Sequence, residues 1–213
     1  ITTGISWDDQ IHYSNALSTS YLFETQKTDS DINFTDEAVR RAQGYEEPSL
    51  SHFDRAEILE HARQLNGSYR SDIASGHVQV NKHEEFVYTL SSIGYIPSAI
   101  GLWLARLLHF DFSSMIQFAR ICNLFSYCLA IAIAIKVTPS KKGLFAFVGM
   151  LPTSIFLASC FSYDAWLISF IILGFAYFLR YAWGDLNEFT VRNIALAFLF
   201  TFLGLSLIHI SEP

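Results

Sequence analysis

The stretch Ser114–Val137, SMIQFARICNLFSYCLAIAIAIKV, decides the fold of this chain. It carries charge only at Arg120 and Lys136, and Pro139 follows its end. It is longer than the roughly 20 predominantly apolar residues that a helix needs to cross the hydrocarbon core of a membrane. We therefore expect a membrane-spanning helix over this stretch.

Three more apolar stretches follow it in the sequence. Residues 144–161 and 164–181 predict a second and a third span, and residues 191–204 predict the beginning of a fourth. The connections between these stretches are short, as in tight helical hairpins. We therefore expect a bundle of transmembrane helices over residues 112–204.

The segment before the first span is apolar but shorter. Residues 96–110 fit a helix with Pro97 in its first turn, where a missing N–H costs little. The helix is too short to cross a membrane. We interpret residues 93–111 as an interfacial or partly inserted helix.

The charge of the chain is divided near residue 90. Residues 1–95 hold 15 acidic and 7 basic residues, a net charge of −8, whereas residues 96–213 hold 5 acidic and 7 basic residues, a net charge of +2. Residues 1–92 are therefore predicted to be an acidic loop domain in water. The acidic balance argues against nucleic acid as a partner, because phosphate contacts need clustered lysine and arginine.

The acidic domain is expected to be mostly helical. Residues 7–25 fit a helix that begins with acidic residues, which the helix dipole favours. Residues 51–65 fit a second helix, and residues 77–88 are undecided because Val78 and Val80 alternate as in a short strand. Together with the spans, these elements predict a fragment of an all-α polytopic membrane protein.

Basic residues near the ends of the spans predict the orientation. They lie in the loop after the first span and beside the loop after the third: Lys136, Lys141, Lys142, Arg180 and Arg192. Both loops are on one side, which the positive-inside rule makes cytoplasmic. Residues 1–92 and the turn at residues 159–164 are then expected on the outer side of a plasma membrane.

Asp8, Asp9 and His12 are the first candidates for chemistry. His12 follows the two acids by four and three residues, so that a helix places the imidazole and a carboxylate on one face. Such a trio could hold a divalent cation, or act as a base near a phosphate-bearing substrate. The alternative is a first helical turn that carries acids with no further role.

Two polar residues in or beside the spans are further candidates. Asp164 begins the third span on the outer side, where it either contributes to the same site as Asp8 and Asp9 or caps the helix. Arg120 lies about two turns inside the first span. It either faces protein, a cavity or an anionic head group, or it snorkels outward or pairs structurally. Asn123, one turn further on, would extend a polar stripe.

Aromatic residues near both predicted interfaces fit an aromatic belt: Tyr88, Tyr95, Trp103, Trp166, Tyr177, Tyr181 and Trp183. The three cysteines Cys122, Cys128 and Cys160 lie in apolar stretches and fit small buried side chains.

Both ends of the chain look artificial. The chain begins at Ile1 without methionine, and residues 205–213, LSLIHISEP, look like the translation of a sequencing adapter rather than a loop after a helix.

Several short motifs, in order, resemble one family. They are Asp8-Asp9-Gln10-Ile11-His12-Tyr13, Gly94-Tyr95-Ile96-Pro97 with Gly101, Ala119-Arg120-Ile121-Cys122-Asn123, Leu151-Pro152 and Ser162-Tyr163-Asp164-Ala165. This set resembles the bacterial membrane proteins grouped as domain of unknown function 2142, over about residues 7–200. That family usually shows Pro-Asp-Glu, two residues, then His-Phe at the first motif. Here the acidic pair and the histidine are kept, and Trp7 replaces the proline.

The family is similar in layout to the C-type glycosyltransferases, which use lipid-phosphate-linked sugars at the outer membrane face. This resemblance implies a further span upstream of Ile1 and a catalytic role for Asp8, Asp9 and His12. One acid would deprotonate the acceptor hydroxyl or help to hold a divalent cation such as Mg²⁺ or Mn²⁺. Arg120 would neutralise the polyprenyl phosphate leaving group, with Asp164, Tyr95 and Asn123 as supporting residues.

The expected function is therefore a membrane glycosyltransferase that moves a sugar from a polyprenyl-phosphate donor to a cell-envelope glycan. Its partners would be membrane lipid and that donor. The alternative is a non-catalytic membrane component, either a transporter of lipid-linked glycan or an envelope assembly subunit. A transporter should carry polar residues deep in several spans, and the later spans here are nearly free of them.

Overall fold

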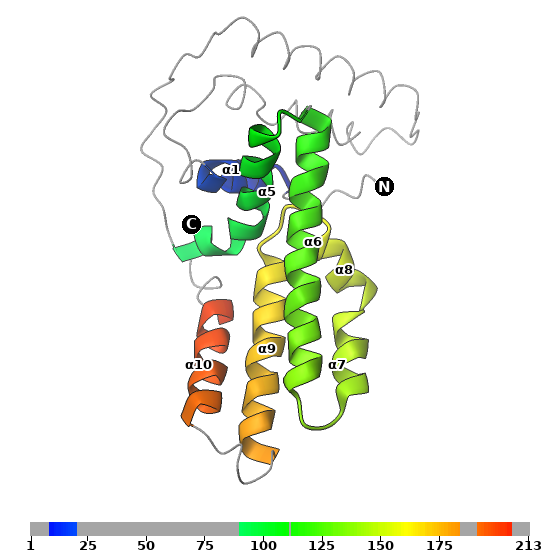
Figure 1. The fold of residues 1–213 in the computed structure, drawn as a ribbon, viewed down its shortest axis with the longest axis vertical. Helices are drawn as coiled ribbons and strands as arrows, with labels where there is room; N and C mark the ends of the chain where they lie inside the picture. Colours follow the sequence, from blue (N-terminus) through cyan, green and yellow to red (C-terminus); the bar gives the residue numbers. More distant parts are fainter. Residues whose placement is uncertain (1–8, 21–89, 111, 184–190, 206–213) are drawn as a thin grey trace, which may run out of the picture.

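The computed structural model describes residues 9–20, 90–110, 112–183 and 191–205, and these are helical with short connections (Figure 1). The helices are α1 (Asp9–Ser20), the 3-10 helix η2 (Leu90–Tyr95), α5 (Ile96–Leu107), α6 (Phe112–Val137), α7 (Lys142–Gly149), α8 (Pro152–Ala158), α9 (Asp164–Trp183) and α10 (Val191–Leu205). No strand occurs within these ranges. The predicted helix at 51–65 and the undecided segment at 77–88 lie outside them.

Two helices are long and apolar enough to cross a membrane, and both were predicted as spans. They are Ser114–Val137 within α6 and Asp164–Trp183, which is α9. α10 is apolar but shorter, in agreement with the predicted beginning of a further span. α5 begins with Pro97 in its first turn as expected, although it ends at Leu107 rather than at residue 110.

The span predicted over residues 144–161 is not one continuous helix, because the helix breaks between α7 and α8. Leu151 has an extended backbone, with φ −56° and ψ 132°. Pro152 causes the break, since its ring disfavours a helical conformation of the preceding residue and it has no N–H to donate. The Tyr127 hydroxyl on α6 donates to the Gly149 carbonyl at 2.9 Å. A backbone acceptor beside the break is thereby satisfied inside the protein.

Small residues allow close packing of two helix pairs. A Cβ atom on Gly101 of α5 would lie 2.6 Å from the Ala119 Cα atom on α6. On α9, a Cβ atom on Gly174 would collide with Thr201 of α10. Backbones that approach so closely are typical of helix contacts within membranes, where dispersion rather than the hydrophobic effect favours association.

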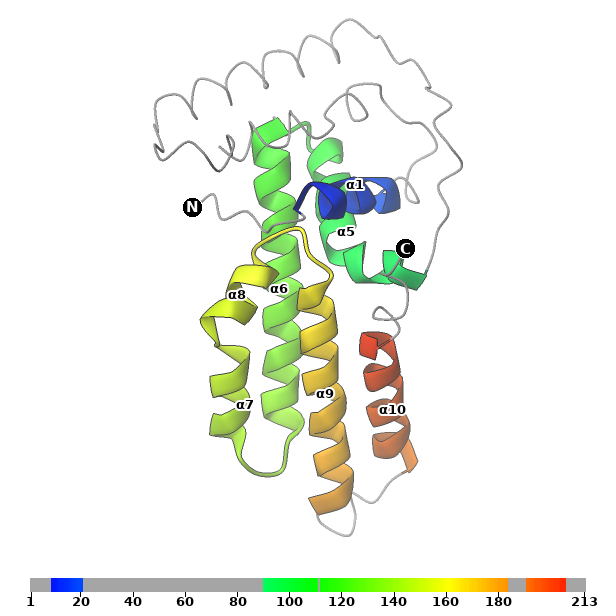
Figure 2. The same ribbon diagram turned by 180° about the vertical axis from the view of Figure 1, so that it is seen from behind.

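α1 lies crosswise against α5, with one of its ends beside the first half of α6 (Figures 1 and 2). It buries Tyr13, Ala16 and Leu17 in a cluster that includes Leu102 of α5 and Ile116 of α6. Its last residue is also held, because the Arg106 Nη2 atom donates to the Ser20 hydroxyl at 2.8 Å. These contacts fix the helix that carries His12 to the rest of the protein.

The two ends of the bundle differ in character (Figures 1 and 2). At one end lie the α6–α7 turn, the end of α9 and the beginning of α10, which carry the basic residues Lys136, Lys141, Lys142, Arg180 and Arg192. α1, η2 and the α8–α9 connection lie away from that end. The segments that carry the candidate site residues are therefore separated from the basic turns by the length of α9.

Candidate functional site

Four segments that are distant in the sequence meet near the beginning of α9. They are α1, the end of η2, the first half of α6, and residues 159–163 between α8 and α9. Their side chains form a cluster of polar and aromatic groups at the end of the bundle away from the basic turns, which for that reason alone we call the outer-end cluster: His12, Asn15, Tyr95, Arg120, Asn123, Phe161, Ser162, Tyr163 and Asp164.

His12 and Tyr95 form the closest polar contact of this cluster. The Nδ1 atom of His12 lies 2.7 Å from the Tyr95 hydroxyl oxygen. The Asn15 amide, one turn along α1 from His12, donates to the same oxygen at 3.4 Å. Tyr163 presents its ring edge-on to the His12 ring, with 5.3 Å between the ring centroids. The imidazole on α1 thus contacts side chains from two other segments, η2 and the α8–α9 connection.

Tyr95 is buried rather than part of an aromatic belt, with only 4% of its surface exposed. Burial is the main reason why the pKa of its phenol rises from 10.0 to about 12. The neighbouring Tyr163 and the Asp164 carboxylate raise the pKa further, while the hydrogen bond from Asn15 lowers it. The phenol is therefore protonated at neutral pH and offers a hydrogen to an acceptor.

Asp164 is the first residue of α9, where the helix dipole favours a negative charge. The Ser162 hydroxyl donates to its Oδ2 atom at 2.8 Å and accepts from its backbone N–H at 3.0 Å. Its charge also acts on Tyr95. Asp164 thus lies in the first helical turn and within the outer-end cluster, and both interpretations of it remain predictions.

Asn123 fixes the connection between α8 and α9. It is 1% exposed, and its amide donates to the carbonyls of Cys160 at 2.9 Å and Ser162 at 3.3 Å. The sequence suggested only that Asn123 extends a polar stripe on α6. The structure gives it a specific task, which is to hold the segment that carries Phe161, Ser162 and Tyr163.

Arg120 faces protein rather than lipid. It is 4% exposed, and its guanidinium carbon lies 5.8 Å from the centroid of the buried Phe161 ring. Tyr13 packs edge-on against the same ring at 5.2 Å. Phe161 therefore has Arg120 of α6 and Tyr13 of α1 as neighbours, three residues before the beginning of α9. Its assignment to a substrate phosphate remains a prediction.

The acidic pair of the first motif is only partly described. Asp9 is the first residue of α1, and His12 follows it by three residues on the same helix. Asp8 and the side chain of Asp9 lie outside the described part of the chain. Within that part, no three His, Cys, Asp or Glu side chains gather as a metal site would require. The divalent cation expected at Asp8 and Asp9 therefore remains a prediction.

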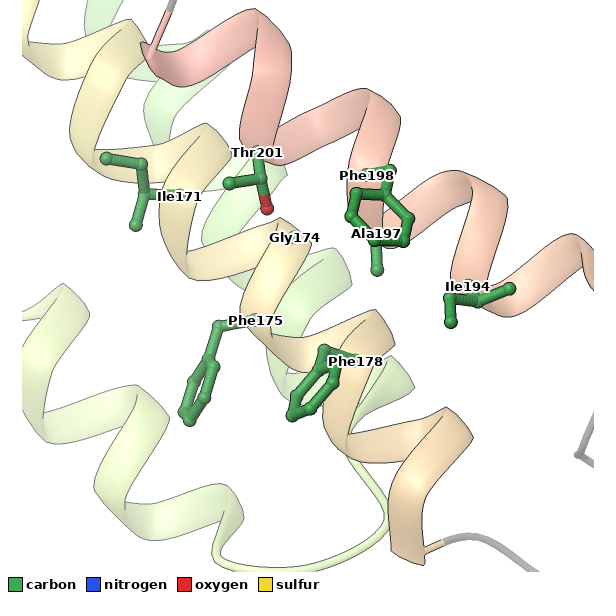
Figure 3. A pocket seen from close by; sticks show the side chains of 8 residues that line it. All are labelled: Ile171, Gly174, Phe175, Phe178, Ile194, Ala197, Phe198 and Thr201. Atoms are coloured by element: carbon green, nitrogen blue, oxygen red, sulfur yellow. The ribbon is translucent and has the colours of Figure 1, made fainter.

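An apolar groove runs between α9 and α10 (Figure 3). Its volume is about 250 Å³, and its lining residues are Ile171, Gly174, Phe175, Phe178, Ile194, Ala197, Phe198 and Thr201. Ile171 and Phe178 follow Asp164 by seven and fourteen residues, which places all three on one face of α9. The groove thus begins about two helical turns from the outer-end cluster.

Sequence reasoning missed Asn15, Ser162 and Tyr163 as members of the cluster. Ser162 and Tyr163 stand in the motif around Asp164, which was a usable signal. Asn15 follows His12 by three residues, a spacing that places both on one helical face. Nothing local to Tyr95 indicates its partner, because 83 residues separate it from His12.

Comparison with known proteins supports the family resemblance. The sequence model of one family, described as "Predicted membrane protein (DUF2142)", matches residues 2–209. This match includes the four segments of the outer-end cluster. It also extends into residues 205–213, whose interpretation as an adapter translation remains a prediction. No curated protein and no solved structure matches the chain significantly.

Proposed function

We propose that this chain, which belongs to the predicted membrane protein family DUF2142, is part of a polytopic protein of a bacterial plasma membrane. In this proposal α6, α9 and α10 lie in the membrane. The basic end of the bundle faces the cytoplasm, in accordance with the positive-inside rule. The outer-end cluster then lies at the opposite, outer face, together with residues 1–92.

We further propose that the outer-end cluster transfers a sugar from a polyprenyl-phosphate donor to a cell-envelope glycan. The observation that carries this proposal is the convergence of α1, η2, α6 and the α8–α9 connection on one set of polar groups. Groups from separate segments that meet around a buried, pKa-shifted side chain are typical of reactive sites. A helix cap alone would not require His12, Asn15 and Tyr95.

In the proposed reaction the acceptor hydroxyl displaces the polyprenyl phosphate at the anomeric carbon of the sugar. The acceptor oxygen forms the new glycosidic bond, and the bond between the sugar and the phosphate oxygen breaks. The electron pair of that bond remains on the polyprenyl phosphate, and the proton of the acceptor hydroxyl passes to a carboxylate, Asp8 or Asp9. A divalent cation at these acids and the charge of Arg120 would stabilise the departing phosphate.

The groove between α9 and α10 supports a lipid-linked donor. It is apolar, and it lies on the same face of α9 as Asp164 (Figure 3). A substrate whose phosphate lies at the outer-end cluster would place its isoprenoid chain beside this groove, where apolar side chains from both helices line the walls. A water-soluble nucleotide sugar has no long apolar chain that could bind in such a groove.

The test is a comparison of surface glycans in cells that carry the full-length protein. Asp8→Ala/Asp9→Ala should abolish the glycan that the wild type restores to a deletion strain. The matched control is Glu46→Ala/Glu47→Ala, which removes another adjacent acidic pair from residues 1–92. If the Asp8/Asp9 variant supports the same glycan as the wild type at equal abundance, the catalytic proposal is wrong. The non-catalytic alternative, a transporter or assembly subunit, then takes its place.

A further inference from the structure

We propose that Tyr95 is a positioning residue for His12. It holds the imidazole as the tautomer with its proton on Nε2, so that His12 presents an N–H donor to an anionic phosphate oxygen of the substrate. The part that concerns the phosphate rests on the proposed function. The part that concerns the tautomer rests only on contacts within the protein.

The direction of the hydrogen bonds at the Tyr95 oxygen assigns the tautomer. Two nitrogen atoms contact this oxygen in the described part of the chain, the Asn15 amide nitrogen and His12 Nδ1. The amide nitrogen can only donate. The phenol hydrogen therefore has Nδ1 as its acceptor, at 2.7 Å. An Nδ1 atom that accepts carries no proton, so that the proton of the neutral ring is on Nε2.

The surroundings of Tyr95 disfavour the opposite arrangement. If Nδ1 donated instead, the phenol oxygen would receive two donors, and its own hydrogen would lack an acceptor among the residues that the structure describes. Tyr95 is only 4% exposed, and a buried hydroxyl without a partner is costly. Loss of the phenol proton would not relieve this conflict at neutral pH, because burial and Asp164 raise the pKa of Tyr95 to about 12.

This tautomer divides the chemical roles within the cluster. An Nε2–H group donates a hydrogen bond and does not accept a proton at that atom. His12 therefore suits the stabilisation of a phosphate oxygen on which negative charge develops. Removal of the proton from the acceptor hydroxyl falls to the carboxylates of the first motif, Asp8 and Asp9.

The tautomer can be measured without any activity. The full-length protein, labelled with ¹⁵N-histidine and placed in lipid bilayers, is studied by NMR at pH 8.5, where histidine of ordinary pKa is neutral. The His12 signals are those that disappear in His12→Gln. We expect an unprotonated Nδ1 and a protonated Nε2 in the wild type, and a mixture of both tautomers in Tyr95→Phe.

Tyr163→Phe is the matched control. It removes a hydroxyl from the other tyrosine that contacts the His12 ring, and it should leave the tautomer unchanged. A proton on Nδ1 in the wild type overturns the assignment. A Tyr95→Phe protein that keeps the Nε2–H tautomer overturns the positioning role.

The ligand is tested with farnesyl phosphate as the probe and farnesol as its uncharged counterpart. The Nε2 signal of His12 should shift with farnesyl phosphate and not with farnesol. If farnesol produces the same shift, or if neither compound changes the signal, His12 does not donate to the phosphate. Such a failure leaves the tautomer result and the Asp8/Asp9 glycan test intact, so that the two proposals fail separately.

Transfer activity provides a second readout for the donor role. The side-chain amide of glutamine reaches approximately as far as Nε2, whereas that of asparagine reaches as far as Nδ1. His12→Gln should therefore retain at least tenfold more activity than His12→Asn. Equal activity of these two variants overturns the donor role of Nε2.

Discussion

Replacing Asn123 with alanine should loosen the α8–α9 connection while leaving α6 itself intact. The change removes the amide that donates to the Cys160 and Ser162 carbonyls, at 2.9 and 3.3 Å. The site is 1% exposed, so that water does not readily replace the lost donor. A buried acceptor left without a partner costs about 1–3 kcal/mol, and hydrogen bonds between helices in membranes fall toward the lower end of that range.

We therefore expect Asn123→Ala to lower the free energy of unfolding by about 1–2 kcal/mol. The assay is reversible unfolding of the protein in mixed micelles with increasing denaturing detergent. Cys128→Ala is the matched control on the same helix, because Cys128 is exposed and should change stability by less than about 0.5 kcal/mol. A loss for Asn123→Ala no larger than that of the control would refute the anchoring role.

Three further predictions concern packing, the helix break and pH. Gly101→Val should cost about 1–3 kcal/mol of stability, because its side chain would enter the α6 backbone; Gly143→Ala, with open space around it, should not destabilise. Tyr127→Phe should cost about 1 kcal/mol in the same unfolding assay, since it removes the donor at the α7–α8 break. Folding raises the pKa of Tyr95 from 10.0 to about 12. The protonated phenol therefore contributes fully to the free energy of unfolding below pH 10, and this contribution is lost as the pH rises toward 12. The wild type should then lose up to about 2–3 kcal/mol more than Tyr95→Phe over that interval, and equal losses would contradict the pKa shift.

The spans could be predicted from the sequence because their signal is local. The apolar runs of α6 and α9 are long enough to cross the hydrocarbon core of a bilayer, and this can be seen without knowing their packing partners. The break before Pro152 could also be predicted from the sequence, because a residue that precedes a proline is disfavoured in the helical conformation. The apolar run at 144–161 by itself does not indicate this interruption, which comes from the proline.

The outer-end cluster was only partly predictable, because its contacts are distant in the sequence. Tyr95 fitted an aromatic belt by composition, whereas its partner His12 lies 83 residues away. Arg120 was expected about two turns inside a span. In the structure Arg120 lies at that depth in α6, but the sequence did not indicate that it lies beside Phe161. Contacts of this kind depend on how far neighbouring helices are shifted along one another, and the hydrophobic periodicity of one helix does not indicate this shift.

Photocrosslinking of the full-length protein in bilayers can show whether the outer-end cluster binds the head group of a phosphate-linked isoprenoid. The probe is a short isoprenoid phosphate that carries a diazirine beside the phosphate. We predict labels in α1, in residues 90–95 and in residues 159–164, which excess unlabelled farnesyl phosphate suppresses. Labels confined to the exposed faces of α7 and α10, with none in those three segments, would contradict it.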